Sequence, residues 1–127
     1  MATWSGYTDT LVKMGACTSA AIISNTNGGI WGITGEQALI TPEEFAKLKE
    51  GYGIRSTMSF TIAGTKYMTP VNTEEFVMGK KGKGGLLIVK TPKTFVIAVV
   101  TEDANIPIEK LSAEIQKFGE ALKAENF

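Results

Sequence analysis

Two runs of apolar residues, 86–91 and 94–101, constrain the fold more than any other feature of this chain. Both are rich in branched side chains, which favour strands. Pro92 and Lys93 separate them, and such a short break predicts a hairpin. Because the runs are almost continuously hydrophobic instead of alternating, we expect central strands that are covered on both faces. The chain must therefore provide further structure above and below a sheet.

Two more hairpins are predicted by turn residues between strand-like runs. Residues 19–24 and 29–34 flank a segment that contains Asn27-Gly28, a strong hairpin signal. Residues 58–62 and 65–69 meet at Ala63-Gly64. The sequence thus predicts pairs of neighbouring strands in an antiparallel arrangement.

Three segments have the pattern of helices. Trp4, Tyr7 and Leu11 recur at helical spacing, which predicts a helix over about residues 3–14. Thr41 and Glu44 form a capping box around Pro42 at the start of a helix that should run to about residue 50. Residues 107–122 predict a long amphipathic helix with one apolar stripe, made of Leu111, Ile115, Phe118 and Leu122.

These elements predict an α+β fold in a single domain over residues 1–127. A central antiparallel β-sheet should carry the N- and C-terminal helices packed on one face and the shorter middle helix on the other.

Composition excludes several classes of function. The net charge is zero and the pI is near 6.3, whereas a dedicated nucleic-acid binder is usually basic. The chain has no histidine, and its acidic residues lie in adjacent pairs whose side chains diverge. We therefore expect no enzyme activity, metal or cofactor. Without an apolar stretch long enough for a membrane span or a secretion signal, and with Cys17 as the only cysteine, a cytoplasmic protein is expected.

A cluster of like charge stands out in this neutral chain. Between Glu75 and Glu102 there is no acidic residue, but there are five lysines: Lys80, Lys81, Lys83, Lys90 and Lys93. Such a cluster suggests a docking surface for an acidic partner, and a solvated loop leading into a strand explains it equally well. The glycines among residues 79–85 indicate that the backbone turns there or accepts a close neighbour.

Taken in order, several segments resemble the profilin family of actin-monomer-binding proteins, and the resemblance covers essentially the whole chain. The segments are Trp4 with Tyr7, residues 18–23, Trp31, residues 64–68, and residues 79–85 leading into 89–91.

The resemblance implies a groove between the first and last helices that binds proline-rich peptides. Its residues would be Trp4, Tyr7, Trp31, the position of Ala121, and Phe127. Flat rings pack well against the rigid polyproline II helix, whose binding orders little. Family members often carry His or Tyr where this chain has Ala121, so weaker proline binding is expected.

The resemblance also implies an actin interface on the far side of the molecule. Its basic contacts would be Lys66, Lys80, Lys81 and Lys90, with Asn105 near the last helix, and phosphoinositide headgroups would engage Lys80, Lys81 and Lys83. Val71 and Met78 stand where relatives carry arginine. The implied partners are monomeric actin and proline-rich elongation factors, and the chain would speed nucleotide exchange on actin without covalent chemistry of its own.

Two other functions fit the residues. The chain could be a surface module for phosphoinositides or other anionic lipids, in which the lysine cluster is the main site. It could also be a generic scaffold whose aromatic residues are only core, in which case both tryptophans should be hidden from a soluble quencher.

Overall fold

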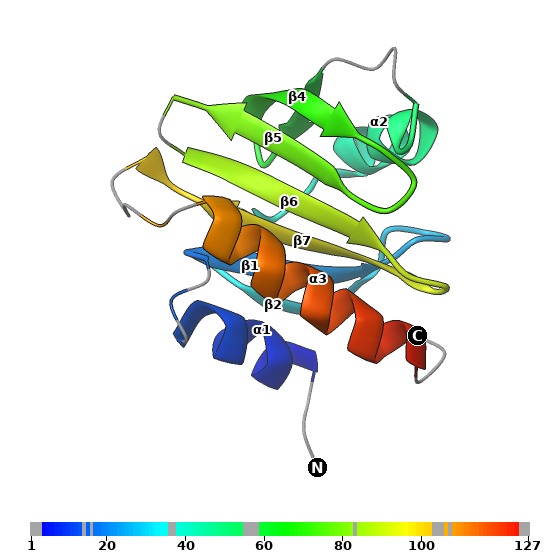
Figure 1. Ribbon diagram of the computed structural model, residues 1–127. Helices are drawn as coiled ribbons and strands as arrows, with labels where there is room; N and C mark the ends of the chain where they lie inside the picture. The colour runs from blue at the N-terminus through cyan, green and yellow to red at the C-terminus, as the bar shows by residue number, and fades with distance from the viewer. Residues whose placement is uncertain are drawn as a thin grey trace.

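The structure is a computed structural model that describes residues 4–13, 15, 17–35, 38–54, 59–82, 84–102, 106 and 108–124. These residues form three helices and seven strands (Figure 1). In chain order they are α1 (Trp4–Lys13), β1 (Ser19–Ser24), β2 (Ile30–Thr34), α2 (Pro42–Gly51), β3 (Ser59–Ile62), β4 (Thr65–Asn72), β5 (Val77–Lys81), β6 (Gly84–Lys90), β7 (Thr94–Val100) and α3 (Ile108–Ala124).

All seven strands form one antiparallel sheet in the order β2-β1-β7-β6-β5-β4-β3. Figure 1 shows α1 and α3 side by side on one face, with α2 behind the sheet. The predicted α+β architecture is confirmed. Strands β6 and β7 lie inside the sheet, and every residue of β7 is buried, as their continuous hydrophobicity predicted.

The sheet separates two hydrophobic cores. The α2-side core includes Leu48 of α2 with Phe95 and Ile97 of β7. The α3-side core includes Leu111 and Ile115 of α3, both fully buried. Each such side chain contributes about 1.5–3 kcal/mol by leaving water, so the apolar stripe holds α3 on the sheet.

One strand was not predicted. The segment that contains Lys80 and Lys81 is not a solvated loop: it forms β5 and pairs along its length with β6. Both roles expected of its glycines occur. A Cβ added to Gly79 would lie 2.9 Å from Cβ of Tyr67, and Gly82 adopts a φ of +59° in the turn to β6. The chain therefore turns at residue 82, within the segment that the glycines indicated.

Glu44 connects the start of α2 to the turn between β3 and β4. The capping box is confirmed: Glu44 N–H donates to Thr41 Oγ1 at 3.2 Å, and Thr41 N–H donates to Glu44 Oε1 at 2.9 Å. The same carboxylate accepts from the N–H groups of Ala63 at 3.0 Å and Gly64 at 2.9 Å, in the turn between β3 and β4. One buried side chain thus fixes both a helix start and a hairpin turn.

Among the residues that the structure describes, no helix is both long and apolar enough to cross a membrane.

Candidate functional site

Four aromatic rings form a continuous series across three elements. Ring centroids lie 5.1 Å apart between Trp31 of β2 and Trp4 of α1, 5.7 Å between Trp4 and Tyr7, and 5.6 Å between Tyr7 and Phe118 of α3. The Tyr7 side chain is 40% exposed, and the other three residues are partly exposed. We call Trp4, Tyr7, Trp31 and Phe118 the aromatic surface. It joins the first and last helices, and all four of its side chains are partly exposed.

A β-bulge directs Trp31 into this surface. Ile22 of β1 pairs with Gly32 and Ile23 pairs with Ile30, so Trp31 is the extra residue of the bulge. Ile33 packs on the α2-side core, and strict alternation would send Trp31 to that side as well. Bulges re-aim side chains. Here the indole turns to the α1 side and contacts Trp4.

The end of the chain contributes a ring that the sequence did not identify as a site residue. The stripe of α3 was predicted to be core, and Leu111, Ile115 and Leu122 are buried, but Phe118 is only partly buried and faces Tyr7. Its place at the edge of the stripe was the available signal. Ala121 is exposed one turn further along α3, and Phe127 lies outside the described residues.

Two of the predicted lysines share one face of the outer strands. Tyr67 and Val77 belong to the α2-side core. Lys66 is one residue from Tyr67 and Lys80 is three residues from Val77, so strand alternation directs both lysines to the α3 side. Met68 lies directly opposite Lys80 in the ladder and is 51% exposed. We call Lys66, Met68 and Lys80 the basic surface. It places an apolar side chain between two positive charges.

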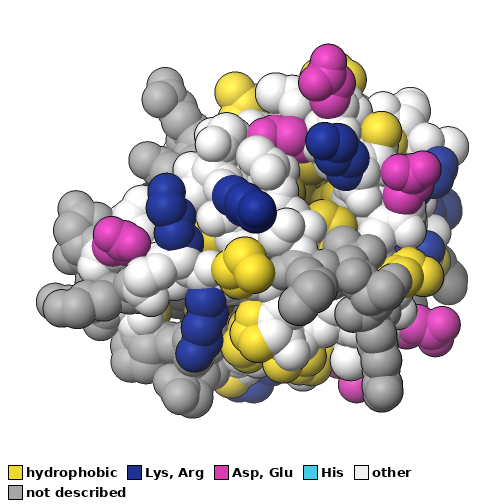
Figure 2. Space-filling model, turned by 90° about the horizontal axis from the view of Figure 1, so that it is seen from above, with side chains coloured by type: hydrophobic (Ala, Val, Ile, Leu, Met, Phe, Trp, Pro, Cys, Tyr) yellow, Lys and Arg dark blue, Asp and Glu magenta, His cyan; other side chains and the backbone are white. Residues whose placement is uncertain are grey.

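The other predicted lysines do not join this surface. Lys81 follows Lys80 on β5 and faces the other way, where it lines an open hollow of about 390 Å³ with Tyr67 and Glu102. Lys90 follows Val89 of the α3-side core and also projects to the α2 side. Figure 2, which views the edge formed by β4, β5 and α2, shows basic side chains spread over this face with acidic and apolar side chains among them. Lys83 and Asn105 lie outside the described residues.

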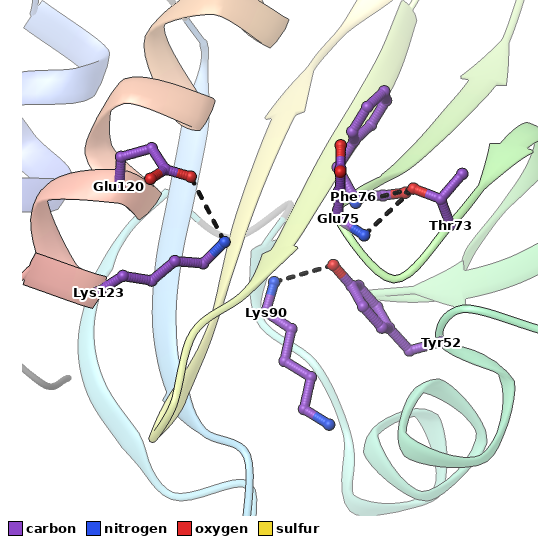
Figure 3. Close-up of polar contacts among 7 residues, drawn as sticks. All are labelled: Tyr52, Thr73, Glu75, Phe76, Lys90, Glu120 and Lys123. Carbon is purple, nitrogen blue, oxygen red and sulfur yellow. Dashed lines mark hydrogen bonds and ion pairs between the residues drawn. The ribbon is translucent and has the colours of Figure 1, made fainter.

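Lys90 is held through its backbone. Its N–H donates to Oη of Tyr52 at 3.0 Å while the side chain extends outward (Figure 3). Burial raises the pKa of Tyr52 to about 12, although the bond from Lys90 works in the opposite direction and the charge of Glu75 adds a small increase. The phenol therefore remains a neutral acceptor at physiological pH.

A groove runs between α3 and the turn that joins β4 to β5. Its volume is about 560 Å³, and its lining includes Glu75, Val89, Gln116, Glu120 and Lys123. Lys123 Nζ lies 3.5 Å from Glu120 Oε1 (Figure 3). On the other wall, Thr73 Oγ1 accepts from the N–H groups of Glu75 and Phe76, both at 3.2 Å, and so shapes the turn. Sequence reasoning did not identify these residues because only the fold brings them together.

The aromatic surface and the groove lie on opposite flanks of α3. Phe118 reaches α1 on one flank, while Gln116 and Lys123 face the β4–β5 turn on the other. Both therefore lie on the α3 side of the sheet, with the helix between them. Within the described part of the chain, no group of three or more His, Cys, Asp or Glu could hold a metal.

The fold and its surfaces define a small α+β domain that exposes rings on one side of its last helix and lysines on the other. A sequence model of the family described as Profilin matches residues 2–127. The chain belongs to the profilin family.

Individual relatives agree with this assignment. Profilin-2 of Acanthamoeba castellanii is 39% identical over 120 residues, which cover 86% of this chain and 92% of the relative. The crystal structure of Acanthamoeba castellanii profilin II has a TM-score of 0.87 at 32% identity and covers 98% of this chain and all of that one. LokiProfilin2, solved in a complex with rabbit actin, has a TM-score of 0.71 at 26% identity and covers 91% of this chain and 92% of that one.

A more distant structure shares the fold alone. Mouse profilin IIa, solved in complex with a double repeat from the FH1 domain of mDia1, has a TM-score of 0.75 at 18% identity. Coverage is 98% of this chain and 99% of that one.

Proposed function

We propose that this chain binds monomeric actin and proline-rich peptides, and that it thereby regulates actin polymerisation and nucleotide exchange. The proposal rests on membership of the profilin family and on a relative solved in complex with actin. The observation that carries it is the aromatic surface, because four partly exposed rings from both ends of the chain meet in one series. A scaffold with core aromatics would not need to expose them.

The aromatic surface suits a polyproline II ligand. That helix is already extended, so its binding costs little ordering, and proline rings stack on flat aromatic rings. We propose Trp4, Tyr7, Trp31 and Phe118 as its contacts, together with the region of Ala121 and Phe127. Because Ala121 offers no ring, proline binding should be weaker than in relatives that carry one.

Tryptophan fluorescence titrated with a polyproline peptide tests this surface, because both indoles of the chain belong to it. We expect the emission to change and to saturate. Tyr7→Ala should reduce the affinity, whereas Lys80→Glu, beyond the other flank of α3, should leave it unchanged. An unchanged spectrum at millimolar peptide would remove the proline-binding function.

We propose the basic surface and the groove between α3 and the β4–β5 turn as the actin interface. Lysines around an exposed methionine combine electrostatic steering with apolar contact, and charges of this kind mainly raise the association rate. Lys81 and Lys90 project to the α2 side and would act only at the margin.

Two double charge reversals test which group of lysines binds actin. Lys66→Glu with Lys80→Glu should abolish binding of actin monomers in a pyrene-actin assay and leave polyproline binding intact. Lys81→Glu with Lys90→Glu is the matched control, because it makes the same charge change on the other face of the sheet. An equal loss in both double variants would place the interface elsewhere, and a simultaneous loss of polyproline binding would indicate unfolding.

Phosphoinositide binding is a second proposal, at Lys80, Lys81 and Lys83. Lys80 and Lys81 project to opposite faces of β5, so single lysines would meet the headgroups and affinity should be low. Liposome binding that outcompetes actin at physiological salt would instead favour the lipid module as the main function.

We further propose that the chain acts by binding alone, as one domain over residues 1–127, in the cytoplasm. The Profilin family match over residues 2–127 supports the single domain, and that family is not a catalytic one.

A further inference from the structure

A polar contact ties α1 to β2 beside the aromatic surface. The Thr34 hydroxyl donates to Oδ1 of Asp9 at 2.5 Å and lies 2.8 Å from Oγ1 of Thr8. Because a hydroxyl has one hydrogen, Thr34 acts as the acceptor in its contact with Thr8. One side chain of β2 therefore contacts two successive residues of α1. Thr8 is fully buried, so this contact lies between the helix and the sheet.

The apolar packing of α1 centres on one deeply buried residue. The helix has ten residues, and helices of this length depend on tertiary packing. Leu11 is its deeply buried apolar anchor, while Trp4 and Val12 are only partly buried. Trp4 and Val12 also pack against this core, and directional bonds added to apolar packing fix the rotation of a short helix more precisely. Thr8 and Asp9 supply those bonds within about one turn of Leu11.

The rings of the aromatic surface belong to the same two elements. Tyr7 directly precedes Thr8, and Trp4 lies one turn before it. On β2, Trp31 is three residues before Thr34 and is the extra residue of the bulge, and it contacts Trp4 of α1. The 5.1 Å contact between Trp4 and Trp31 therefore depends on how α1 sits against β2.

We propose that Thr34 is a positioning residue for the aromatic surface. Its contacts with Thr8 and Asp9 set the rotation of α1 on β2 so that Trp4 meets Trp31 and Tyr7 meets Phe118. Binding surfaces work when neighbouring bonds hold their side chains in the productive geometry. This inference rests on the proposed binding of proline-rich peptides and names the residue that organises that surface.

Three threonine variants test the inference. Thr34→Val keeps the shape of the side chain and removes the hydroxyl, and Thr34→Ser retains the hydroxyl. Thr10→Val is the control, because Thr10 is exposed on the same helix and its hydroxyl donates to Gly6 O within α1. Each variant is titrated with a polyproline peptide below its melting transition. Circular dichroism records the coupling between the two indoles.

We expect Thr34→Val to weaken polyproline affinity about tenfold. A loss of this size corresponds to a protein in which the rings are correctly arranged for about a tenth of the time. The indole coupling should fall in parallel, while actin binding stays unchanged. Thr34→Ser and Thr10→Val should match the wild type in both measurements. Wild-type affinity and coupling in Thr34→Val would overturn the inference, and so would an equal effect of Thr10→Val, since that would reflect threonine loss in general.

If Thr34→Val does not fold, Asp9→Ala is measured in its place, because Asp9 is exposed. A loss of polyproline affinity of about threefold or more in Asp9→Ala supports the inference, and wild-type affinity overturns it. If the wild-type protein itself does not bind polyproline, the proposed function fails. The indole coupling of Thr34→Val then still decides whether Thr34 positions the rings.

Discussion

Replacing Glu44 with alanine should destabilise the protein more than any other single charge removal on α2. Its carboxylate accepts three backbone N–H bonds, from Thr41 at 2.9 Å, Ala63 at 3.0 Å and Gly64 at 2.9 Å. Hydrogen bonds to a charged group contribute about 1.5–3 kcal/mol each, and the lower value applies because water can reach the turn. Ala63 adopts a φ of +51°, which costs about 1 kcal/mol in a residue other than glycine and makes the turn depend on outside support.

The two bonds to the turn contribute about 1.5 kcal/mol each and the capping-box bond about 1 kcal/mol, so the expected loss is about 4 kcal/mol in the free energy of unfolding. For a chain of this size that corresponds to roughly 15 °C in Tm. Urea unfolding followed by tryptophan fluorescence measures the loss. Hydrogen exchange at the amides of Ala63 and Gly64 should become faster.

Glu43→Ala is the matched control, because Glu43 is exposed in the same first turn of α2. Its removal should cost no more than about 0.5 kcal/mol through the helix dipole. A loss below about 1 kcal/mol in Glu44→Ala, or an equal loss in both variants, would refute the assigned role of the carboxylate.

Three other variants or conditions give independent checks. Burial raises the pKa of Tyr52 to about 12 from 10. The stability that the neutral phenol contributes is therefore complete below pH 10 and is lost as pH rises through 12. Melting curves should show less alkaline destabilisation in Tyr52→Phe than in the wild type. Burial also raises the pKa of Cys17 to about 12 from 9, so a disulfide reagent at pH 8 should label it slowly in the native protein and quickly in urea; rapid native labelling would contradict its burial. Gly79→Ala would place a Cβ 2.9 Å from Cβ of Tyr67 and should lower unfolding free energy by about 2 kcal/mol; a neutral effect by urea titration would contradict the close approach.

Local patterns predicted most elements because their signals do not depend on distant partners. The capping box at Thr41 and Glu44 and the Asn27-Gly28 turn are such signals, and each produced the expected element. Strand β5 was missed because glycine and lysine are poor strand formers, and its pairing with β6 decides its conformation. Once β5 is a strand, alternation alone separates Lys80 from Lys81.

The aromatic surface was predictable in part. Trp4, Tyr7 and Trp31 came from resemblance, and the structure brings them together. The bulge that redirects Trp31 depends on register with β1, which a single strand sequence does not encode. Phe118 lies at the edge of an otherwise buried apolar stripe of α3. The helical spacing of that stripe does not distinguish a ring in the core from a ring at the surface.

The position of α3 has a consequence for how ligands share this molecule. This helix of seventeen residues presents Phe118 on the flank of the aromatic surface and Gln116 with Lys123 on the flank of the groove. If the proposed peptide lies along the rings and the proposed protein partner lies over the lysines, the two ligands would contact opposite flanks of α3, and we expect them to bind at the same time. Because Leu111 and Ile115 are buried beneath this helix, a small tilt of α3 on the sheet is one way in which one ligand would affect the other.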